Sequence, residues 1–244
     1  MGGIIWGSFL NVVAYRSIHG MSVIVPRSHC PKCNHILAWY DLVPVFSWLL
    51  LRGSCRYCHA TISPLYPFIE LLTALLALLL YYADIDPFFY ASYFCFFSAL
   101  IISIRTDLEY MLISRFFSLY MIPVGIILSA YHALPISPIE SFFGASFGYA
   151  VLYITAFIFR CITHKDGLGE GDSELLAMIG SFTGIIGAWF ALSAGSIIGS
   201  LIIAVYLFIT KKGPNTKTPF GPFLVLGAIL YVLYYQSILT LCMY

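Results

Sequence analysis

Apolar runs long enough to cross a bilayer dominate this chain. Of its 244 residues, 61% are hydrophobic and 9% are charged, whereas soluble domains carry roughly 45–50% apolar and about 25% charged residues. A chain of this length could not bury so much apolar surface in water. Because backbone polar groups must be satisfied internally in lipid, the sequence predicts an all-α membrane protein.

The lengths of the apolar runs predict how often the chain crosses the membrane. A helical span needs about 20 apolar residues, and on this scale we expect a polytopic protein with about eight transmembrane helices. The expected spans are residues 1–15, 65–82, 87–104, 116–134, 139–159, 173–187, 188–210 and 220–241. The sixth is short and rich in glycine, so we expect protein rather than lipid to shield it.

The basic residues predict the orientation. All 12 Lys and Arg lie in odd-numbered connections between the expected spans. Because basic loops stay in the cytoplasm, we expect both termini outside and residues 16–64 in the cytoplasm. The predicted organisation is a first transmembrane segment at 1–15, a cytoplasmic loop at 16–64 and a helical core at 65–244.

Two C-x-x-C pairs lie in the expected cytoplasmic loop. Cys30 and Cys33 form the first, and Cys55 and Cys58 the second, with 21 residues between the pairs. This spacing is typical of a tetrahedral zinc site, and a reducing cytoplasm disfavours disulfides. Four sulfur ligands leave no open coordination position, so the zinc is expected to be structural. The apolar stretch between the pairs, residues 36–51, is expected on the membrane surface or against the helical bundle.

Two aspartates stand at the cytoplasmic ends of expected spans. Asp107 follows the third span, and Asp172 ends a Gly-x-Gly-Asp sequence that opens the sixth. An acid at membrane depth is expensive and is therefore a functional candidate. Two adjacent carboxylates share one proton, so that one activates water while the other polarises a carbonyl. Taken singly, Asp172 could instead cap a helix and Asp107 could be a solvated loop residue.

At these residues the sequence resembles the type IV prepilin peptidases, which combine leader peptidase and N-methyltransferase activity. The resemblance runs along almost the whole chain in six ordered motifs. They are Gly7-Ser8-Phe9-Leu10-Asn11 with its continuation to Arg16, the two cysteine pairs, Tyr66-Pro67-Phe68-Ile69-Glu70, the Asp107 segment, Gly169-Glu170-Gly171-Asp172, and Pro219-Phe220-Gly221-Pro222.

The resemblance implies an intramembrane aspartyl endopeptidase of the bacterial inner membrane. Its partners would be type IV prepilin or pseudopilin substrates and membrane lipid. No nucleic acid is expected among them. Asp107 and Asp172 take the catalytic roles by motif match. The second implied activity methylates the new amino terminus with S-adenosyl-L-methionine as methyl donor.

For methyl transfer we consider Gly53 and Glu70. Glu70 could hold the substrate amine or pair with a nearby base, and Gly53 could admit the donor or only turn the chain into the second cysteine pair. The alternatives to a bifunctional enzyme are a peptidase without methyl transfer, a protease of the presenilin or signal peptide peptidase type, and a membrane scaffold or transporter with a zinc-binding anchor.

Three positions depart from the family pattern. Glu174 stands where family members commonly have Lys, Ser114-Arg115 stands where they commonly have Pro-Asp, and Ser54 stands where a basic residue is common.

Overall fold

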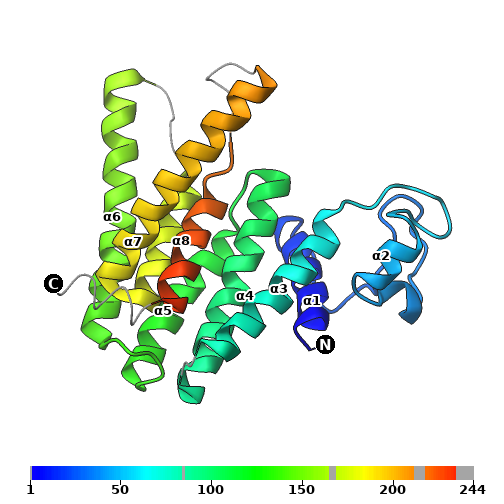
Figure 1. Ribbon diagram of the computed structural model, residues 1–244, viewed down its shortest axis with the longest axis horizontal. Helices are drawn as coiled ribbons and strands as arrows, with labels where there is room; N and C mark the ends of the chain where they lie inside the picture. Colours follow the sequence, from blue (N-terminus) through cyan, green and yellow to red (C-terminus); the bar gives the residue numbers. More distant parts are fainter. Residues whose placement is uncertain (1, 84–85, 165–168, 212–217, 235–244) are drawn as a thin grey trace. The chain divides into compact units, whose positions relative to one another are not determined.

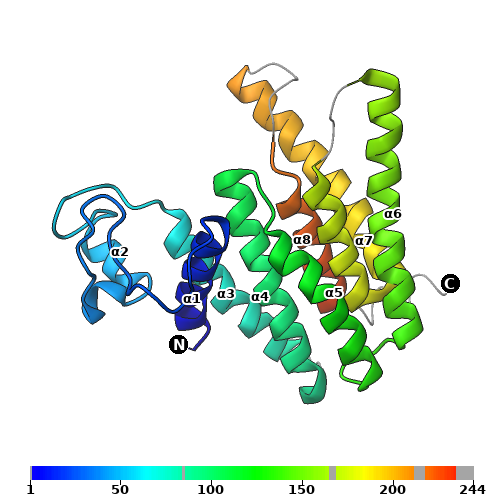
Figure 2. The same ribbon diagram turned by 180° about the vertical axis from the view of Figure 1, so that it is seen from behind.

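The computed structural model describes residues 2–83, 86–164, 169–211 and 218–234, and no β-strand occurs among them. The chain divides into two compact units, Met1–Tyr82 (unit 1) and Ala83–Tyr244 (unit 2) (Figures 1 and 2). Unit 1 holds α1 (Gly2–Ile18), the 3-10 helix η1 (Trp39–Leu42), α2 (Phe46–Leu50) and α3 (Leu65–Tyr82). Unit 2 holds α4 (Pro87–Tyr110), α5 (Arg115–Ala130), α6 (Pro138–Thr163), α7 (Glu170–Thr210) and α8 (Gly221–Leu233).

The predicted all-helical membrane fold is confirmed. Within the described residues, four helices, α3, α4, α6 and α7, are long and apolar enough to cross a membrane, while α5 and α8 are shorter apolar helices. The count of about eight spans stays a prediction, as does the division at residues 15 and 64.

In unit 1, α1 runs antiparallel to α3 at close range. A Cβ on Gly7 would lie 2.8 Å from the Cα of Glu70, and the side chain of Asn11 donates a 3.1 Å hydrogen bond to the carbonyl of Tyr66. The absence of a side chain at Gly7 therefore lets the two backbones meet beside Glu70.

Helix α4 continues further than the apolar run predicts. Asp86 caps its start by accepting from the Phe88 N–H at 2.9 Å, and Met111 ends it in the left-handed conformation. Residues 105–107 therefore belong to the helix and are buried, with Arg105 2% and Asp107 6% exposed. The helix thus continues beyond residue 104, where the expected span ends, and the ion pair of Arg105 with Glu109 one turn on supports its last turn.

Helix α7 consists of two arms that meet at Gly184. Its φ of 72° and ψ of −175° are non-helical and fall in a region that essentially only glycine occupies. The bend lies before the boundary expected between 187 and 188, and Gly187 instead packs within the second arm against Tyr231 of α8.

The bend at Gly184 returns the chain toward its own start. A straight helix would separate Asp172 from Gly195 by roughly 35 Å. Instead, the second arm follows α8, and Gly195 packs on the backbone of Phe223 (Figures 1 and 2). Phe223 is two residues from Gly221, which lies against Asp107. The bend thus brings the start of α8 to the end of unit 2 where Asp107 and Asp172 lie.

Candidate active site and metal centre

Asp107 occupies the last turn of α4, and its orientation is fixed from α8. Its Oδ2 accepts a 3.0 Å hydrogen bond from the Gly221 N–H. At 6% exposure inside a helix, it is not the solvated loop residue that the sequence alone left open.

Asp172 lies in the first turn of α7, where Gly169 is the N-cap. The capping alternative therefore does not describe Asp172. Its side chain is partly exposed and is close enough to Asp107 for the two carboxylates to interact electrostatically. The structure brings together the two aspartates that the sequence singled out.

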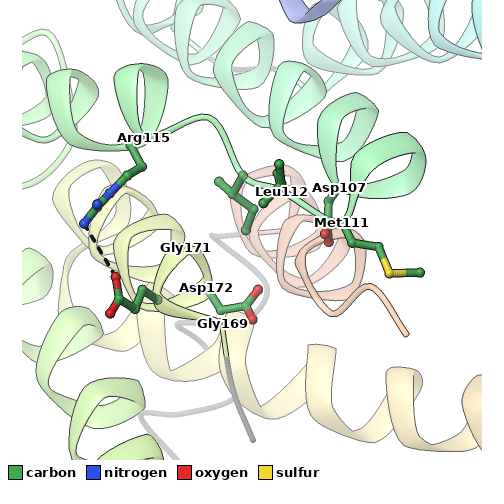
Figure 3. A pocket seen from close by; sticks show the side chains of 9 residues that line it. Asp107, Met111, Leu112, Arg115, Gly169, Gly171 and Asp172 are labelled. Carbon is green, nitrogen blue, oxygen red and sulfur yellow. Dashed lines mark ion pairs between the residues drawn. The ribbon is translucent and has the colours of Figure 1, made fainter. Parts of the chain in front are cut away.

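Both carboxylates face one pocket of about 340 Å³. Figure 3 shows the side chains of Asp107 and Asp172 reaching into it from different helices. Its lining is Asp107, Met111, Leu112, Ile113, Arg115, Gly169, Glu170, Gly171 and Asp172. Most of these residues come from the α4–α5 connection and the start of α7. This volume lies at the lower end of the roughly 300–1,000 Å³ that is typical of ligand pockets in proteins.

Gly171 sets how closely these two parts of the pocket approach. A Cβ added there would lie 3.0 Å from the Cβ of Ile113. Gly171 therefore permits close approach of the start of α7 to the α4–α5 connection beside Asp172.

Gly221 is a site residue to which the sequence analysis gave no role. Its N–H holds Asp107, and an added Cβ would lie 2.7 Å from the Asp107 Oδ2. The available signal was its place before Pro222, since proline favours the first turn of a helix and α8 begins at Gly221.

We predict that Gly221→Ala lowers any turnover that depends on Asp107 by about a hundredfold, because displacing a catalytic group by about 1 Å costs this much. The matched control is Gly227→Ala on the same helix, where a Cβ would crowd Ala191 at 2.6 Å. The control is expected to lower thermal stability without the loss of turnover. Equal turnover losses in both variants would mean that only the packing of α8 matters.

An ion pair joins the start of α5 to α7. Glu174 Oε1 accepts from Arg115 Nε at 2.8 Å, and Glu174 Oε2 accepts from the Ser118 hydroxyl at 3.2 Å. Arg115 also lies 3.8 Å from Glu170 (dashed line in Figure 3). Two of the departures from the family pattern, at 115 and 174, are therefore the two partners of one contact.

The four predicted metal ligands also meet. The sulfur atoms of Cys30, Cys33, Cys55 and Cys58 all lie within 4.8 Å of one another. The Cys30 and Cys58 sulfurs are 3.8 Å apart, close to the roughly 3.8 Å edge of a tetrahedron with Zn–S bonds of about 2.3 Å. Neighbouring His35 instead stacks on Tyr57, with ring centroids 3.6 Å apart.

The two cysteine pairs fold as matching turns. The Cys30 N–H donates to His35 O and the Asn34 N–H to Cys30 O; the equivalent bonds join Cys55 to Ala60 and His59 to Cys55. Burial acts to raise the pKa of Cys30, but hydrogen bonds from the backbone of Cys33 and Lys32 bring it down to about 7. Such backbone donors favour the thiolate, the form that binds metal. The residues present thus fit a zinc ion.

Gly53 and Glu70, considered for methyl transfer, both shape the loop backbone. Gly53 has a φ of 68°, and a Cβ there would lie 2.9 Å from the Trp48 ring. Glu70 is 6% exposed, and its Oε2 accepts a 2.7 Å hydrogen bond from the Val45 N–H. Among the ion pairs of the described residues, none joins Glu70 to a base.

Two family models match the chain. The Bacterial Peptidase A24 N-terminal domain matches residues 1–83, and the Type IV leader peptidase family matches residues 94–209. The first match coincides closely with unit 1, and the second holds both aspartates.

Similar proteins cover nearly the full chain. The type 4 prepilin-like proteins leader peptide-processing enzyme of Escherichia coli O78:H11 is 33% identical over 98% of this chain and 93% of its own length. A prepilin leader peptidase/N-methyltransferase of Aeromonas salmonicida is 32% identical over 89% of this chain and 74% of its own. That of Stutzerimonas stutzeri is 28% identical over 97% and 89%. No solved structure matched the chain.

Proposed function

Because this chain belongs to the type IV prepilin leader peptidase family, we propose that it is an aspartic endopeptidase that removes the leader from type IV prepilins or pseudopilins. The observation that carries the proposal is the presence of Asp107 and Asp172 in one pocket. A scaffold or transporter would not require two acids that line one pocket, and the similar proteins are processing enzymes.

In the proposed mechanism, the two carboxylates share one proton because like charges at close range resist joint ionisation. The ionised carboxylate takes a proton from a water molecule, and the oxygen of that water attacks the scissile carbonyl carbon. The protonated carboxyl donates to the carbonyl oxygen. Proton transfer to the amide nitrogen then releases the new amino terminus. The Gly221 N–H holds Asp107 in the orientation that this exchange needs.

We further propose that the chain methylates the new amino terminus. S-adenosyl-L-methionine would supply the methyl group, and the amine nitrogen would lose a proton as it accepts it. Gly53 and Glu70 are the residues proposed to serve this step by positioning. What supports them is that each fixes the backbone of the loop in unit 1, at Trp48 and at Val45.

The proposed topology has about eight spans in the bacterial inner membrane, with both termini outside and residues 16–64 in the cytoplasm. The two arms of α7 support this count, because the bend at Gly184 divides one helical element into two arms, each of which would be one crossing. The expected partners are the prepilin and membrane lipid, and no nucleic acid.

The test incubates the purified chain in lipid with a prepilin peptide and S-adenosyl-L-methionine. Mass spectrometry of the products reads cleavage and methylation separately. Cleavage with an added methyl group supports both activities, whereas cleavage alone identifies a peptidase without methyl transfer. An intact peptide under conditions where one of the similar proteins cleaves it would contradict the proposal.

We predict that the chain binds about one zinc ion through Cys30, Cys33, Cys55 and Cys58. Elemental analysis after purification without chelators measures this. Cys30→Ser should lose the zinc and loosen the loop to proteolysis, because metal binding is coupled to local folding. Cys161→Ser, a thiol on α6 outside the cluster, should retain it. A zinc-free parent chain would contradict the metal site.

A further inference from the structure

Helix α2 exposes an apolar face that no described element of unit 1 covers. Phe46, Leu49 and Leu50 are 60%, 59% and 82% exposed, and their spacing of i, i+3 and i+4 places them on one side of the helix. Trp48 points elsewhere, since its Nε1 donates to the Ile62 carbonyl at 3.2 Å. The fold therefore uses Trp48 to hold α2 and leaves the opposite side apolar.

The hydrogen bond between Val45 and Glu70 sets the depth of α2. Val45 is the N-cap of α2, and its N–H donates to Glu70 at 2.7 Å. Glu70 is the sixth residue of α3, which places it about 7.5 Å along that helix axis. The loop that carries α2 (Figure 1) is thus fastened inside a membrane-crossing element rather than beyond its end.

The length of α3 brings that attachment close to the hydrocarbon. With 18 residues, α3 is about 27 Å long, slightly shorter than the roughly 30 Å hydrocarbon core. Almost its full length is needed to cross, so Leu65 lies near the edge of the core and Glu70 lies deeper. Backbone at such depth must be satisfied by protein, and the Glu70 carboxylate does this for the Val45 N–H.

The flanking residues fit a lipid surface. Trp39, in η1 just before α2, is 78% exposed, and tryptophan favours the membrane interface. Exposed Arg52 follows Leu51, the C-cap of α2. Arginine beside an apolar helix face complements the anionic headgroups of a bilayer.

We propose that α2 is an interfacial helix whose Phe46, Leu49 and Leu50 side chains insert into the bilayer, held at that depth by the Val45–Glu70 hydrogen bond. This anchors the metal-binding loop to the membrane surface independently of any substrate. The membrane contact of α2 does not depend on the peptidase activity, so it can be tested independently of the proposed function.

The test replaces Phe46 or Leu50 by the photo-crosslinking residue p-benzoylphenylalanine in the full chain. The protein is reconstituted in vesicles of phosphatidylethanolamine and phosphatidylglycerol, irradiated and analysed by mass spectrometry. We expect phospholipid adducts at both positions, several-fold more abundant than at Tyr57. Tyr57 is the control because it is an exposed aromatic residue on the second cysteine turn rather than on α2.

Zinc content equal to that of the parent chain shows that each labelled loop is folded. Crosslinks from 46 and 50 to residues 83–244, to a second copy or to added prepilin peptide, in place of lipid, would overturn the proposal. Equal amounts of lipid adduct at 46, 50 and 57 would also overturn the proposal, because α2 would then lie no deeper in the bilayer than the control position. Glu70→Gln, which keeps an acceptor, should retain the adducts at 46, whereas Glu70→Leu should reduce them several-fold.

Discussion

Asp107→Asn and Asp172→Asn are each expected to reduce leader cleavage by about a thousandfold or more, since positioned acid–base groups contribute on the order of 10²–10⁴ in rate. An amide keeps the shape of the side chain but neither accepts a proton from water nor shares one. The measurement is cleavage of a prepilin peptide by the reconstituted variants. Near-normal cleavage by either variant would contradict the dyad.

Two controls separate lost chemistry from lost folding. Asp86→Asn changes an acid at the opposite end of α4, where its role is to cap the helix, and should leave cleavage unchanged. Methylation of a pre-cleaved pilin peptide should survive in both active-site variants, because methyl transfer depends on orientation of the amine rather than on carboxylates. Loss of methylation together with cleavage would point to a collapsed fold.

The sequence singled out the proposed catalytic pair because its signal is local. An acid beside a long apolar run is costly, so Asp107 and Asp172 stand out without knowledge of the fold. The two cysteine pairs are equally local, and the structure brings their four sulfurs together. The contact of Gly221 with Asp107 spans 114 positions in the chain, and no spacing rule connects residues so far apart.

Helix boundaries were predicted less well than helix existence. By hydropathy the apolar run ends before Arg105. Helix α4 nevertheless continues to Tyr110, and Arg105 forms an ion pair with Glu109 in this last part of the helix. In α7 the run of glycines marked a break without locating it. The bend lies at Gly184 because this residue adopts the non-helical conformation, whereas Gly187 is required for close packing on Tyr231.

The roles of Gly53 and Glu70 were left open by the sequence. A glycine and a glutamate suit a role in methyl transfer and a purely structural role equally well. A positive φ at Gly53 and the bond from Val45 to Glu70 are tertiary facts. They give each residue a structural task that exists without substrate, so loss of methylation after Gly53→Val would not by itself identify a donor site.

The departures at 115 and 174 could not be interpreted one at a time. Glu174 replaces a common Lys and Arg115 a common Asp, so each alone looks like a lost charge. Their 2.8 Å contact shows that the two departures form one ion pair in this chain. Glu174 lies two residues after Asp172, and Arg115 follows the connection that leaves Asp107. The pair therefore connects the segments that carry the two aspartates.

Glu174→Lys and Arg115→Asp should each lower kcat by about tenfold, and the double variant should recover most of it. The expected effect is below the roughly 3–5 kcal/mol of a fully buried pair, because the Arg115 side chain is 67% exposed and solvent screens it, although Glu174 is only 4% exposed. Each single change places like charges together at the wall of the pocket. In the double variant, the lysine introduced at position 174 can donate to the aspartate introduced at position 115 and to the Ser118 hydroxyl, which now accepts.

The kinetic pattern distinguishes positioning from general stability. If the pair sets the separation of the two aspartates, kcat falls in the single variants while KM changes little, and the pH profile of cleavage shifts because the coupling of the dyad depends on that separation. Methylation of a pre-cleaved peptide should be unaffected in all three variants. A double variant in which the two single losses multiply would show that Glu174 and Arg115 act separately, and the aspartates would then be positioned by Gly221 and the packing of Ile113 on Gly171 alone.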